Sequence, residues 1–546
     1  MSRISGADAL VESLLAHGVD TMFGLPGGQL DHFFDAIYRS EGQLKLVRSR
    51  HEQGCAYMAY GYAKSTGRVG VYTVVPGPGL LNSTCALCTA YAANAQVLCL
   101  SGQLPSSDIG SGLGHLHEIP DQLALIRGLT KWAERIEHPA HTPLLMNEAF
   151  RQLKTGRPRP VELEMPMDVM ALETEVAAPV PLRSPVHPPI DSEQVEQAVQ
   201  LLAGAKKPLF IVGGGAIDAG PILLKLAEKL QAPVVSKRHG RGVVSDRHYL
   251  SQTLPAGHHL WRDADVVLAV GSRIKMPLTM WGHDDDLRIV RIDIDPVQIT
   301  RPIESDVAMV NDASEALQAL FDALEGRIDD RPSREQELTA LKQEFRARFE
   351  GGIGPQFAYL QAIREALPDD GFFVDEVTQV GFASWYAFPV YQPRHFISAG
   401  YQGTLGYGFA TALGVQVGNP DKAVVSINGD GGFMFNLPEI ATAVQYNIPL
   451  VTIVFNDNTY GNVKRQQKEW FDGRFIASDL HNPDYMKLAE AVGMKGYRAE
   501  SPDALKNTLF QAFEARRPCL IEVPVGVMPT PWQFILMEQV REKLAG

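Results

Sequence analysis

Short runs of apolar and β-branched residues recur along the chain, and most of them end in glycine or aspartate. Uninterrupted apolar runs of this length are typical of parallel strands buried on both faces, and the loops after such strands often carry functional groups. Amphipathic stretches with helical spacing lie between the runs, and the first of them places on one side Ala7, Leu10, Val11, Leu14 and Leu15. We therefore predict an α/β protein built from doubly wound parallel sheets that are covered by helices.

The apolar runs fall into three groups, which predict three doubly wound parallel-sheet domains. The first group lies within residues 1–170, the second within 190–330 and the third within 355–546. A proline-rich stretch over 171–189 is typical of a linker, and a charged helical pattern over 331–354 indicates a connector. A chain of 546 residues is too long for one ordinary core, which agrees with a division into several domains.

Composition narrows the class of protein. Hydrophobic residues make up 45% and charged residues 21% of the chain, the net charge is −13, and no block of like charges occurs. These values are ordinary for a globular protein and argue against nucleic acid or an anionic membrane as a partner. The N-terminal stretch carries acids among its apolar residues, unlike a signal peptide, and five cysteines are an odd number for a disulfide framework. We therefore expect a cytoplasmic protein without membrane spans.

The strongest chemical signal lies in the segment AVVSINGDGGFMFNLPEIATAVQYNIPLVTIVFNDNTYGN. Asp430 and Asp457 each follow a predicted buried strand, so we expect them at the same carboxyl edge of a parallel sheet. Two oxygen ligands at such an edge suit Mg²⁺, which takes further ligands from phosphate oxygens. The glycines beside Asp430 let the backbone approach a phosphate group, and the helix that follows can offer its N–H groups.

This segment resembles the cofactor-binding signature of thiamine diphosphate (ThDP)-dependent enzymes, and the chain as a whole resembles their acetolactate synthase and benzaldehyde lyase group. The resemblance implies that Mg²⁺ is held by Asp430, Asp457 and the carbonyl group of Thr459. It also assigns to the cofactor site five residues of the signature, Gly429, Gly431, Gly432, Tyr460 and Gly461. Thr378 and Gln379, which follow the predicted strand FFVDE, stand where relatives contact the diphosphate group. Many relatives carry Asn where this chain carries Asp457, so the extra negative charge is a departure from the family pattern.

A second motif, RHEQGCAYMAYGYAK, places Glu52 at the start of an amphipathic helix. Taken alone, a glutamate in the first helical turn is most often a solvated residue that interacts with the helix dipole. The resemblance implies instead that Glu52 binds the pyrimidine ring of ThDP and drives the tautomer that activates the coenzyme. The acid must then stay protonated near neutral pH, and an apolar pocket that disfavours its charged form would ensure this.

The segment SAGYQGTLGYGFATALG resembles the stretch in which a bulky apolar residue bends ThDP into its active shape. That residue corresponds to Leu405, and the carbonyl group of Gly403 is implied to accept a hydrogen bond from the amine of the coenzyme. Without the flanking glycines and the family match, Leu405 would be interpreted simply as a core residue.

Residues of the first domain are expected to face the substrate. Gly28 and Gln29 stand where benzaldehyde lyase-like relatives carry a small residue and a histidine, and Pro26 just before them is assigned to the cofactor site. His117 stands where relatives carry a glutamine near the reacting carbon. A single histidine is usually structural, whereas an imidazole at this position would relay a proton to a reaction intermediate.

The middle domain gives a weaker signal. Gly213, Gly214 and Gly215 follow a predicted strand and would serve as a phosphate-binding turn. Relatives use this domain for FAD, for ADP or for no ligand, so FAD is possible here and is not predicted. The spacing lacks the G-x-G-x-x-G pattern with a ribose-binding acid, which argues against a nicotinamide oxidoreductase.

The resemblance covers nearly the whole chain and implies a ThDP- and Mg²⁺-dependent carboligase that decarboxylates a 2-oxo acid such as pyruvate and joins the product to a second carbonyl group. The alternative is a ThDP-dependent lyase or decarboxylase of the benzaldehyde lyase, benzoylformate decarboxylase or 2-hydroxyacyl-CoA lyase type. Synthases of branched-chain precursors carry a tryptophan where this chain has Gln466, which weakens an assignment to that pathway.

The expected partners are small 2-oxo acids and aldehydes, together with further copies of the chain. Relatives form the active site between two subunits, which implies a homodimer or a homotetramer. A catalytically inactive regulatory subunit is disfavoured because Glu52 and Asp430 are both present.

Overall fold

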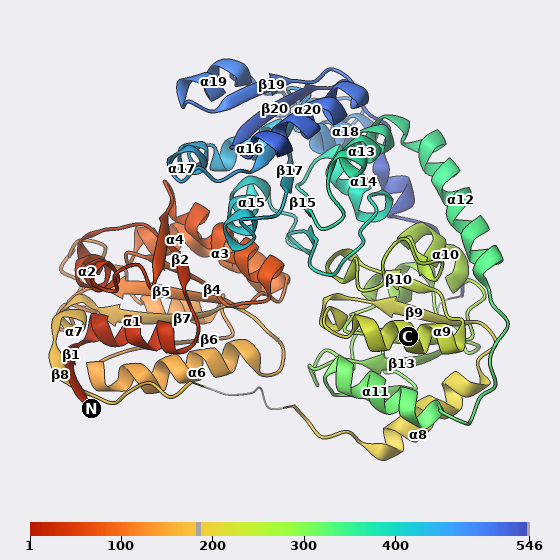
Figure 1. Cartoon of the computed structure of the whole chain (residues 1–546), viewed down its shortest axis with the longest axis horizontal. Coiled ribbons are helices and arrows are strands. Elements are labelled where there is room, and N and C mark those ends of the chain that lie inside the picture. Colours follow the sequence, from red (N-terminus) through yellow and green to blue (C-terminus); the bar gives the residue numbers. More distant parts are fainter. Residues whose placement is uncertain (182–186, 543–546) are drawn as a thin grey trace.

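The computed structural model describes residues 1–181 and 187–542, and within these residues it contains three six-stranded parallel sheets with helices around them (Figure 1). The predicted α/β class with three doubly wound sheets is confirmed. The limits of the three domains stay predictions. None of the helices in the described ranges is both long enough and apolar enough to span a bilayer.

The first sheet has the strand order β3-β2-β4-β5-β7-β6. Its strands are β2 (Thr21–Gly24), β3 (Lys45–Arg48), β4 (Gly70–Val74), β5 (Val97–Gln103), β6 (Trp132–Arg135) and β7 (Val161–Pro166). The helices of this region are α1 (Gly6–Ala16), α2 (Asp31–Arg39), α3 (Glu52–Thr66), α4 (Pro78–Ala92), α5 (Gln122–Arg127), α6 (Thr142–Lys154) and α7 (Met167–Ala171). Side chains of α1 that were expected on one face are buried, except that Leu15 is only partly covered.

The expected linker over 171–189 is partly structured. Strand β8 (Glu173–Val176) pairs antiparallel with β1 (Ser2–Ser5), and Ser5 then caps helix α1 through its side chain. Neither strand has an apolar run, because the pair lies at the surface and is not part of the large sheet. The expectation of an irregular segment was therefore wrong for Glu173–Val176, and residues 182–186 lie outside the described part.

The second sheet has the order β11-β10-β9-β12-β13-β14. Its strands are β9 (Pro208–Val212), β10 (Val234–Ser236), β11 (Ser251–Gln252), β12 (Val266–Val270), β13 (Arg288–Ile292) and β14 (Val307–Met309). Its helices are α8 (Ser192–Gly204), α9 (Gly220–Leu230), α10 (Leu254–Trp261) and α11 (Ala313–Leu324). The expected charged connector forms helix α12 (Glu335–Gly352), which buries four apolar side chains, Leu338, Leu341, Phe345 and Phe349.

The third sheet has the order β16-β15-β17-β18-β20-β19. Its strands are β15 (Phe372–Val374), β16 (Phe396–Ile397), β17 (Val424–Gly429), β18 (Val451–Asn456), β19 (Lys495–Arg498) and β20 (Cys519–Pro524). Its helices are α13 (Gly354–Ala366), α14 (Gln379–Ala387), α15 (Tyr407–Gly418), α16 (Asp430–Phe433), α17 (Glu439–Gln445), α18 (Gly461–Trp470), α19 (Tyr485–Ala491) and α20 (Pro502–Ala515).

Helices α3 and α15 join the first and third regions and pack against each other along their lengths (Figure 1). A Cβ atom at Gly61 would lie 2.0 Å from the carbonyl oxygen of Thr411, and one at Gly414 would lie 1.9 Å from that of Met58. Only glycine fits at such distances, so the two backbones touch directly. The helix that begins with Glu52 is thereby fixed to the region that carries Asp430.

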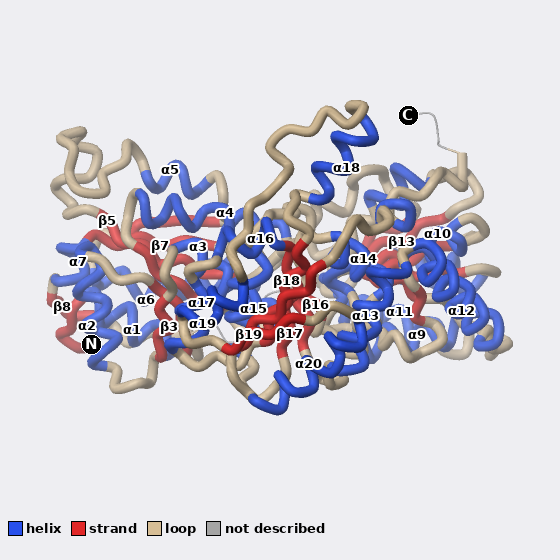
Figure 2. The backbone as a smooth tube through the Cα atoms, turned by 90° about the horizontal axis from the view of Figure 1, so that it is seen from above, coloured by secondary structure: helices blue, strands red, loops and turns tan. Residues whose placement is uncertain are grey.

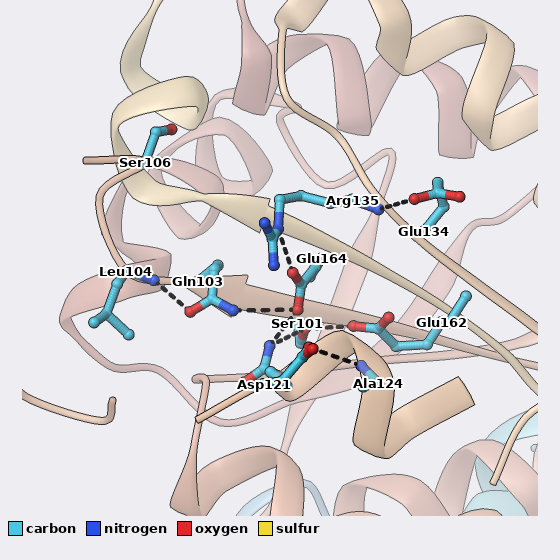
Figure 3. Close-up of polar contacts among 12 residues, drawn as sticks. Ser101, Gln103, Leu104, Ser106, Asp121, Ala124, Glu134, Arg135, Glu162 and Glu164 are labelled. Carbon is cyan, nitrogen blue, oxygen red and sulfur yellow. Dashed lines mark hydrogen bonds and ion pairs between the residues drawn. The ribbon is translucent and has the colours of Figure 1, made fainter. Parts of the chain in front are cut away.

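Strand β7 carries two fully buried acids, Glu162 and Glu164 (Figure 3). Glu164 accepts hydrogen bonds from Arg135 Nε and from Gln122 Nε2, the latter at 2.8 Å. Glu162 accepts one from Ser101 Oγ at 2.6 Å, and its second oxygen has no partner among the described residues. Burial, and then the negative charge of Glu164, raise the pKa of Glu162 well above its ordinary value. Burial therefore favours the neutral form of Glu162, while Glu164 is paired with Arg135.

Replacing Glu162 by Gln is expected to stabilise the protein near neutral pH. A carboxyl group with a raised folded-state pKa contributes its full stability only in acid, and this contribution is lost as the pH rises toward that pKa. Glutamine mimics the neutral acid and cannot ionise, so we expect a Tm about 2–4 °C higher at pH 7.5 and little difference near pH 4.5. Thermal unfolding at both pH values measures this effect.

Glu164→Gln is the matched control and should lower Tm, because it removes the partner of Arg135. An E162Q protein less stable than wild type at pH 7.5 would contradict the argument.

Candidate active site

A cavity of about 170 Å³ lies at the carboxyl edge of the third sheet. Strands β17 and β18 are paired neighbours, and Asp430 and Asp457 follow them directly, as the sequence predicts. The cavity is lined by most of the residues assigned to the cofactor from the C-terminal motifs, namely Thr378, Gln379, Leu405, Gly429, Asp430, Gly431, Gly432, Asp457, Thr459, Tyr460 and Gly461. Gly403 does not line it and is exposed, two residues before Leu405.

At this edge Asp430 is buried and Asp457 is partly buried, and their negative charges repel each other. Burial, and then the charge of Asp457, raise the pKa of Asp430, and burial also raises the pKa of Asp457. Asp430 Oδ2 accepts a hydrogen bond from Asn482 at 2.7 Å, and Asp457 Oδ1 accepts from the backbone N–H and the hydroxyl group of Thr459, both at 3.0 Å. A divalent cation would relieve this repulsion, so the donor set fits Mg²⁺.

A third carboxylate, thiol or imidazole ligand is not found beside this pair, since the described ranges contain no group of three His, Cys, Asp or Glu side chains that could hold a metal ion. The other coordination positions of a bound metal ion would then be filled by main-chain carbonyl groups and by oxygen atoms of a ligand. Mg²⁺ is commonly bound in this way next to phosphate groups. The role of the Thr459 carbonyl group as a ligand stays a prediction.

The turn after β17 packs closely against neighbouring side chains at two of its glycines. A Cβ atom at Gly431 would lie 2.5 Å from the ring of Tyr460, and one at Gly432 would lie 2.2 Å from Glu376 Oε1. The side-chain oxygen of Gln379, in the cavity wall, is buried without a partner in the described residues. This acceptor requires a donor from a ligand or from water, whereas the bare backbone beside it offers N–H groups that suit a diphosphate group.

Glu52 is the first residue of α3, and its side chain is only 14% exposed. Its Oε2 accepts a hydrogen bond from Asn82 Nδ2 at 3.0 Å and lies 4.0 Å from His51 Nδ1. In the single chain, polar groups therefore flank this carboxyl group, in contrast to the purely apolar pocket that the sequence suggests. Glu52 does not line the cavity that contains Asp430.

The other expected residues of the first region also lie away from that cavity and divide into two kinds. Pro26 and Gly28 are exposed, whereas Gln29 is buried and its Oε1 lies 3.0 Å from Nδ1 of His117. The turn Val75–Gly79 lies between this pair and Glu52. A Cβ atom at Gly77 would lie 2.3 Å from the carbonyl oxygen of His117, and one at Gly79 would lie 3.7 Å from Glu52 Oε1.

Comparison with known proteins identifies the family. Models of thiamine pyrophosphate (thiamine diphosphate) enzymes match the chain in three regions: the N-terminal TPP binding domain over residues 4–125, the central domain over 195–320 and the C-terminal TPP binding domain over 376–523. The chain belongs to the ThDP-dependent enzymes. Glu52 lies within the N-terminal match, whereas Asp430 and Asp457 lie within the C-terminal match.

The relatives to which the chain is similar are named for two different reactions, acetolactate synthesis and decarboxylation. The chain is 32% identical to a probable acetolactate synthase large subunit from Methanococcus aeolicus, over 96% of this chain and 92% of that protein. It is 33% identical to the acetolactate synthase large subunit of Haemophilus influenzae, over 96% and 95% respectively. It is also 32% identical to a probable 2-ketoarginine decarboxylase from Pseudomonas aeruginosa, over 95% and 94%.

Two residues of this ThDP-dependent enzyme that support the site were not found by sequence reasoning. Asn482, which holds Asp430, lies in a loop without a periodic pattern. Glu439 is fully buried at the start of α17, and its carboxylate accepts hydrogen bonds from the backbone N–H groups of Arg50 and His51, each at 3.0 Å. Glu439 therefore joins the helix that follows the GDG turn to the segment immediately before Glu52.

Replacing Glu439 by Ala is expected to destabilise the enzyme and to displace Glu52. The change leaves two backbone N–H groups without acceptors inside the protein, which costs about 2 kcal/mol or more of unfolding free energy. Glu439→Gln keeps one acceptor oxygen and should lose clearly less. Denaturant unfolding of both variants gives the comparison, and equal stability of wild type and E439A would show that the contact has no such role.

A second cavity, of about 300 Å³, lies between the first and second regions. Gly214 and Gly215 line it, together with the cationic side chains of Lys64 and Arg157 and the carboxylate of Asp293. Burial lowers the pKa of Lys64 to about 8. The glycine turn expected to bind phosphate thus opens into a partly cationic cavity.

Proposed function

We propose that the chain is a ThDP- and Mg²⁺-dependent carboligase of the acetolactate synthase type. It would release CO₂ from a 2-oxo acid such as pyruvate and join the remaining fragment to a second carbonyl group. The observation that carries this proposal is the cavity that places Asp430, Asp457 and the glycine turn together, in a chain that also keeps Glu52. The names of the acetolactate synthase relatives support this choice of reaction.

The residues of the chain have separate tasks in this proposal. Asp430, Asp457 and the Thr459 carbonyl group would hold Mg²⁺, while Thr378, Gln379 and the glycine turn would hold the diphosphate group. When bound, ThDP supplies the electron sink that allows a carboxylate to leave as CO₂. Leu405, in the cavity wall, would support the coenzyme and help to exclude water, which favours decarboxylation and limits premature protonation.

Glu52 would hold a proton at its carboxyl group and share it with the pyrimidine ring, which keeps the coenzyme in its active tautomer. This role requires Glu52 and the cavity with Asp430 to face the same coenzyme, and the single chain does not bring them together. We therefore infer that a second copy completes the site. Helix α18 and the loop that follows it stand out from the rest of the backbone (Figure 2). Consistent with a covered surface, this segment exposes the large apolar side chains of Val463, Trp470, Phe471, Phe475 and Ile476.

Mixing two inactive variants should restore activity if the site is shared between copies. In a hybrid of Glu52→Gln and Asp430→Asn chains, one site carries both changes and the other carries neither. Random reassociation of equal amounts is expected to give about a quarter of wild-type activity in a twofold dimer. Activity is measured after joint refolding or co-expression, with each variant alone as control. A mixture as inactive as its components would argue that each chain forms its site alone.

The alternative is a lyase or simple decarboxylase, which the similarity to the probable 2-ketoarginine decarboxylase favours. Incubation with ThDP, Mg²⁺ and pyruvate, with and without an added aldehyde, distinguishes the two reactions by their products. Acetolactate or another hydroxyketone is the expected result, and acetaldehyde alone would refute carboligation. A panel of other 2-oxo acids then identifies the preferred donor, and a visible spectrum of the purified protein shows whether a flavin is bound.

A further inference from the structure

The side-chain amide of Gln29 lies between two partners from the loop that contains His117. Gln29 is 6% exposed, its Nε2 donates to the carbonyl oxygen of Leu116 at 3.2 Å, and its Oε1 lies 3.0 Å from His117 Nδ1. In the described part of the chain, Nε2 of His117 makes no hydrogen bond. One imidazole nitrogen is thus held by the protein while the other remains free for a ligand.

The chemistry of these groups determines where the imidazole proton lies. A carbonyl oxygen can only accept, so the atom of Gln29 that faces Leu116 must be the NH₂ group. The amide oxygen then faces Nδ1 of His117, and because this oxygen can also only accept, Nδ1 must carry the hydrogen. In the neutral ring, Nε2 is then unprotonated and presents a lone pair.

His117 is held in place through its backbone as well. Its φ angle is 70°, a left-handed conformation that a residue with a side chain rarely adopts. Its carbonyl group packs against Gly77, whose N–H donates to Gln122 Oε1 at 2.9 Å. Gln122 Nε2 in turn donates to Glu164 at 2.8 Å, the buried acid that is labelled in Figure 3. Such an unfavourable conformation persists only where the surroundings fix it, which is unusual for a solvated surface histidine.

We propose that Gln29 is a positioning residue that locks His117 in the Nδ1–H tautomer, so that Nε2 accepts a proton from a hydroxyl group on the reacting carbon of the substrate. This inference rests on the proposed function. In the step, the substrate O–H bond breaks, an N–H bond forms at Nε2, and the ring becomes an imidazolium whose Nδ1–H still donates to Gln29. In the reverse direction the imidazolium returns the proton to the oxygen.

The substrate class follows from this direction of transfer. A ring locked as a proton acceptor at Nε2 acts on groups that arrive as hydroxyls. The oxygen keeps the electron pair of its O–H bond and uses it to form the carbonyl group, while a carbon–carbon bond on the same carbon breaks and its electron pair would pass to the electron sink that bound ThDP supplies. Such groups occur where a hydroxyketone is cleaved, and where a newly joined product is released. A glutamine side chain in place of His117 has no basic nitrogen and cannot take up this proton.

The tautomer can be measured without turnover. ¹⁵N NMR of the histidine-labelled holoenzyme, with the His117 signals identified by their loss in His117→Gln, should show a protonated Nδ1 and a bare Nε2. Gln29→Met has a similar volume and no hydrogen-bonding amide, so it should shift His117 toward the Nε2–H tautomer. A bare Nδ1 in the wild type, or an unchanged tautomer in Q29M, would overturn the proposal.

A double-mutant cycle tests whether Gln29 acts through His117. Q29M is expected to lower kcat/KM about 10- to 100-fold and H117Q about 100-fold or more, with the double variant no worse than H117Q. Multiplying effects would show that Gln29 acts independently and would refute the proposal. Thermal unfolding and ThDP binding confirm that each variant is folded. A wild-type enzyme without ThDP-dependent turnover would instead contradict the proposed function. The NMR measurement of the tautomer does not depend on turnover and therefore tests the role of Gln29 separately.

Discussion

Glu52→Gln is expected to lower kcat by about two to four orders of magnitude, the usual range for loss of a proton-transferring group. Glutamine has the shape of glutamic acid and can still accept the hydrogen bond from Asn82, so the fold should be preserved. It cannot share an acidic proton with the coenzyme ring. The loss should therefore appear in turnover, while Tm and the binding of ThDP change little.

The measurement is ThDP-dependent release of CO₂ from the best 2-oxo acid, under saturating coenzyme. Asn82→Ala provides the matched control, because it removes the partner of Glu52 and leaves the acid itself in place. We expect a loss of no more than about tenfold for this control, as is common when a neutral hydrogen-bond partner is removed. An E52Q enzyme with turnover within a factor of three of wild type would remove Glu52 from the mechanism.

Asp430→Asn is expected to weaken the joint binding of Mg²⁺ and ThDP by about 100-fold or more, which corresponds to about 2.7 kcal/mol. The change removes one of two neighbouring carboxylates that a divalent cation would hold together. Asp457→Asn is a sharper control than an alanine variant, because asparagine has the same size and keeps a neutral oxygen ligand for the cation. The Asp457→Asn variant should still bind Mg²⁺ and ThDP, with a smaller loss of affinity than Asp430→Asn.

Titration of the metal-free protein with ThDP at fixed Mg²⁺, followed by calorimetry, gives these affinities. The pKa values of the two aspartates also determine whether this affinity rises or falls with pH. The pKa values of Asp430 and Asp457 are both raised by burial, and a protonated carboxyl group cannot bind the cation. Affinity should therefore fall as the pH is lowered. Equal affinity of D430N and wild type would place the metal elsewhere.

Much of the fold could be predicted because buried parallel strands appear in a sequence as uninterrupted apolar runs. The strands that carry Asp430 and Asp457 are of this kind, and their adjacency follows from the strand–helix–strand connection. The pair β1 and β8 was missed because each strand is short, lies at the surface and lacks such a run. Pairing of two segments from opposite ends of a region leaves no local pattern.

The site was predictable where a motif is local and less so where a contact joins distant residues. The glycine turn and its neighbours lie together as their spacing suggests. Glu439 begins an amphipathic helix and resembles a solvated residue in the sequence, although it binds backbone groups that lie almost four hundred positions earlier. The separation of Glu52 from the cavity has no local pattern in the sequence, and only the resemblance implied it, through an active site formed between two subunits.

The backbone contact between α3 and α15 has a consequence for how two sites in an assembly would influence each other. If Glu52 of each copy serves the neighbour's coenzyme, then α3 contributes to one active site through Glu52. Helix α15, which follows Leu405, lies next to the other active site. Helices that touch through Gly61 and Gly414 have no side-chain layer to absorb a shift, so they move as one rigid body. A movement of the chain around one coenzyme would then displace residues at the second site. Binding of successive coenzyme molecules would therefore be cooperative.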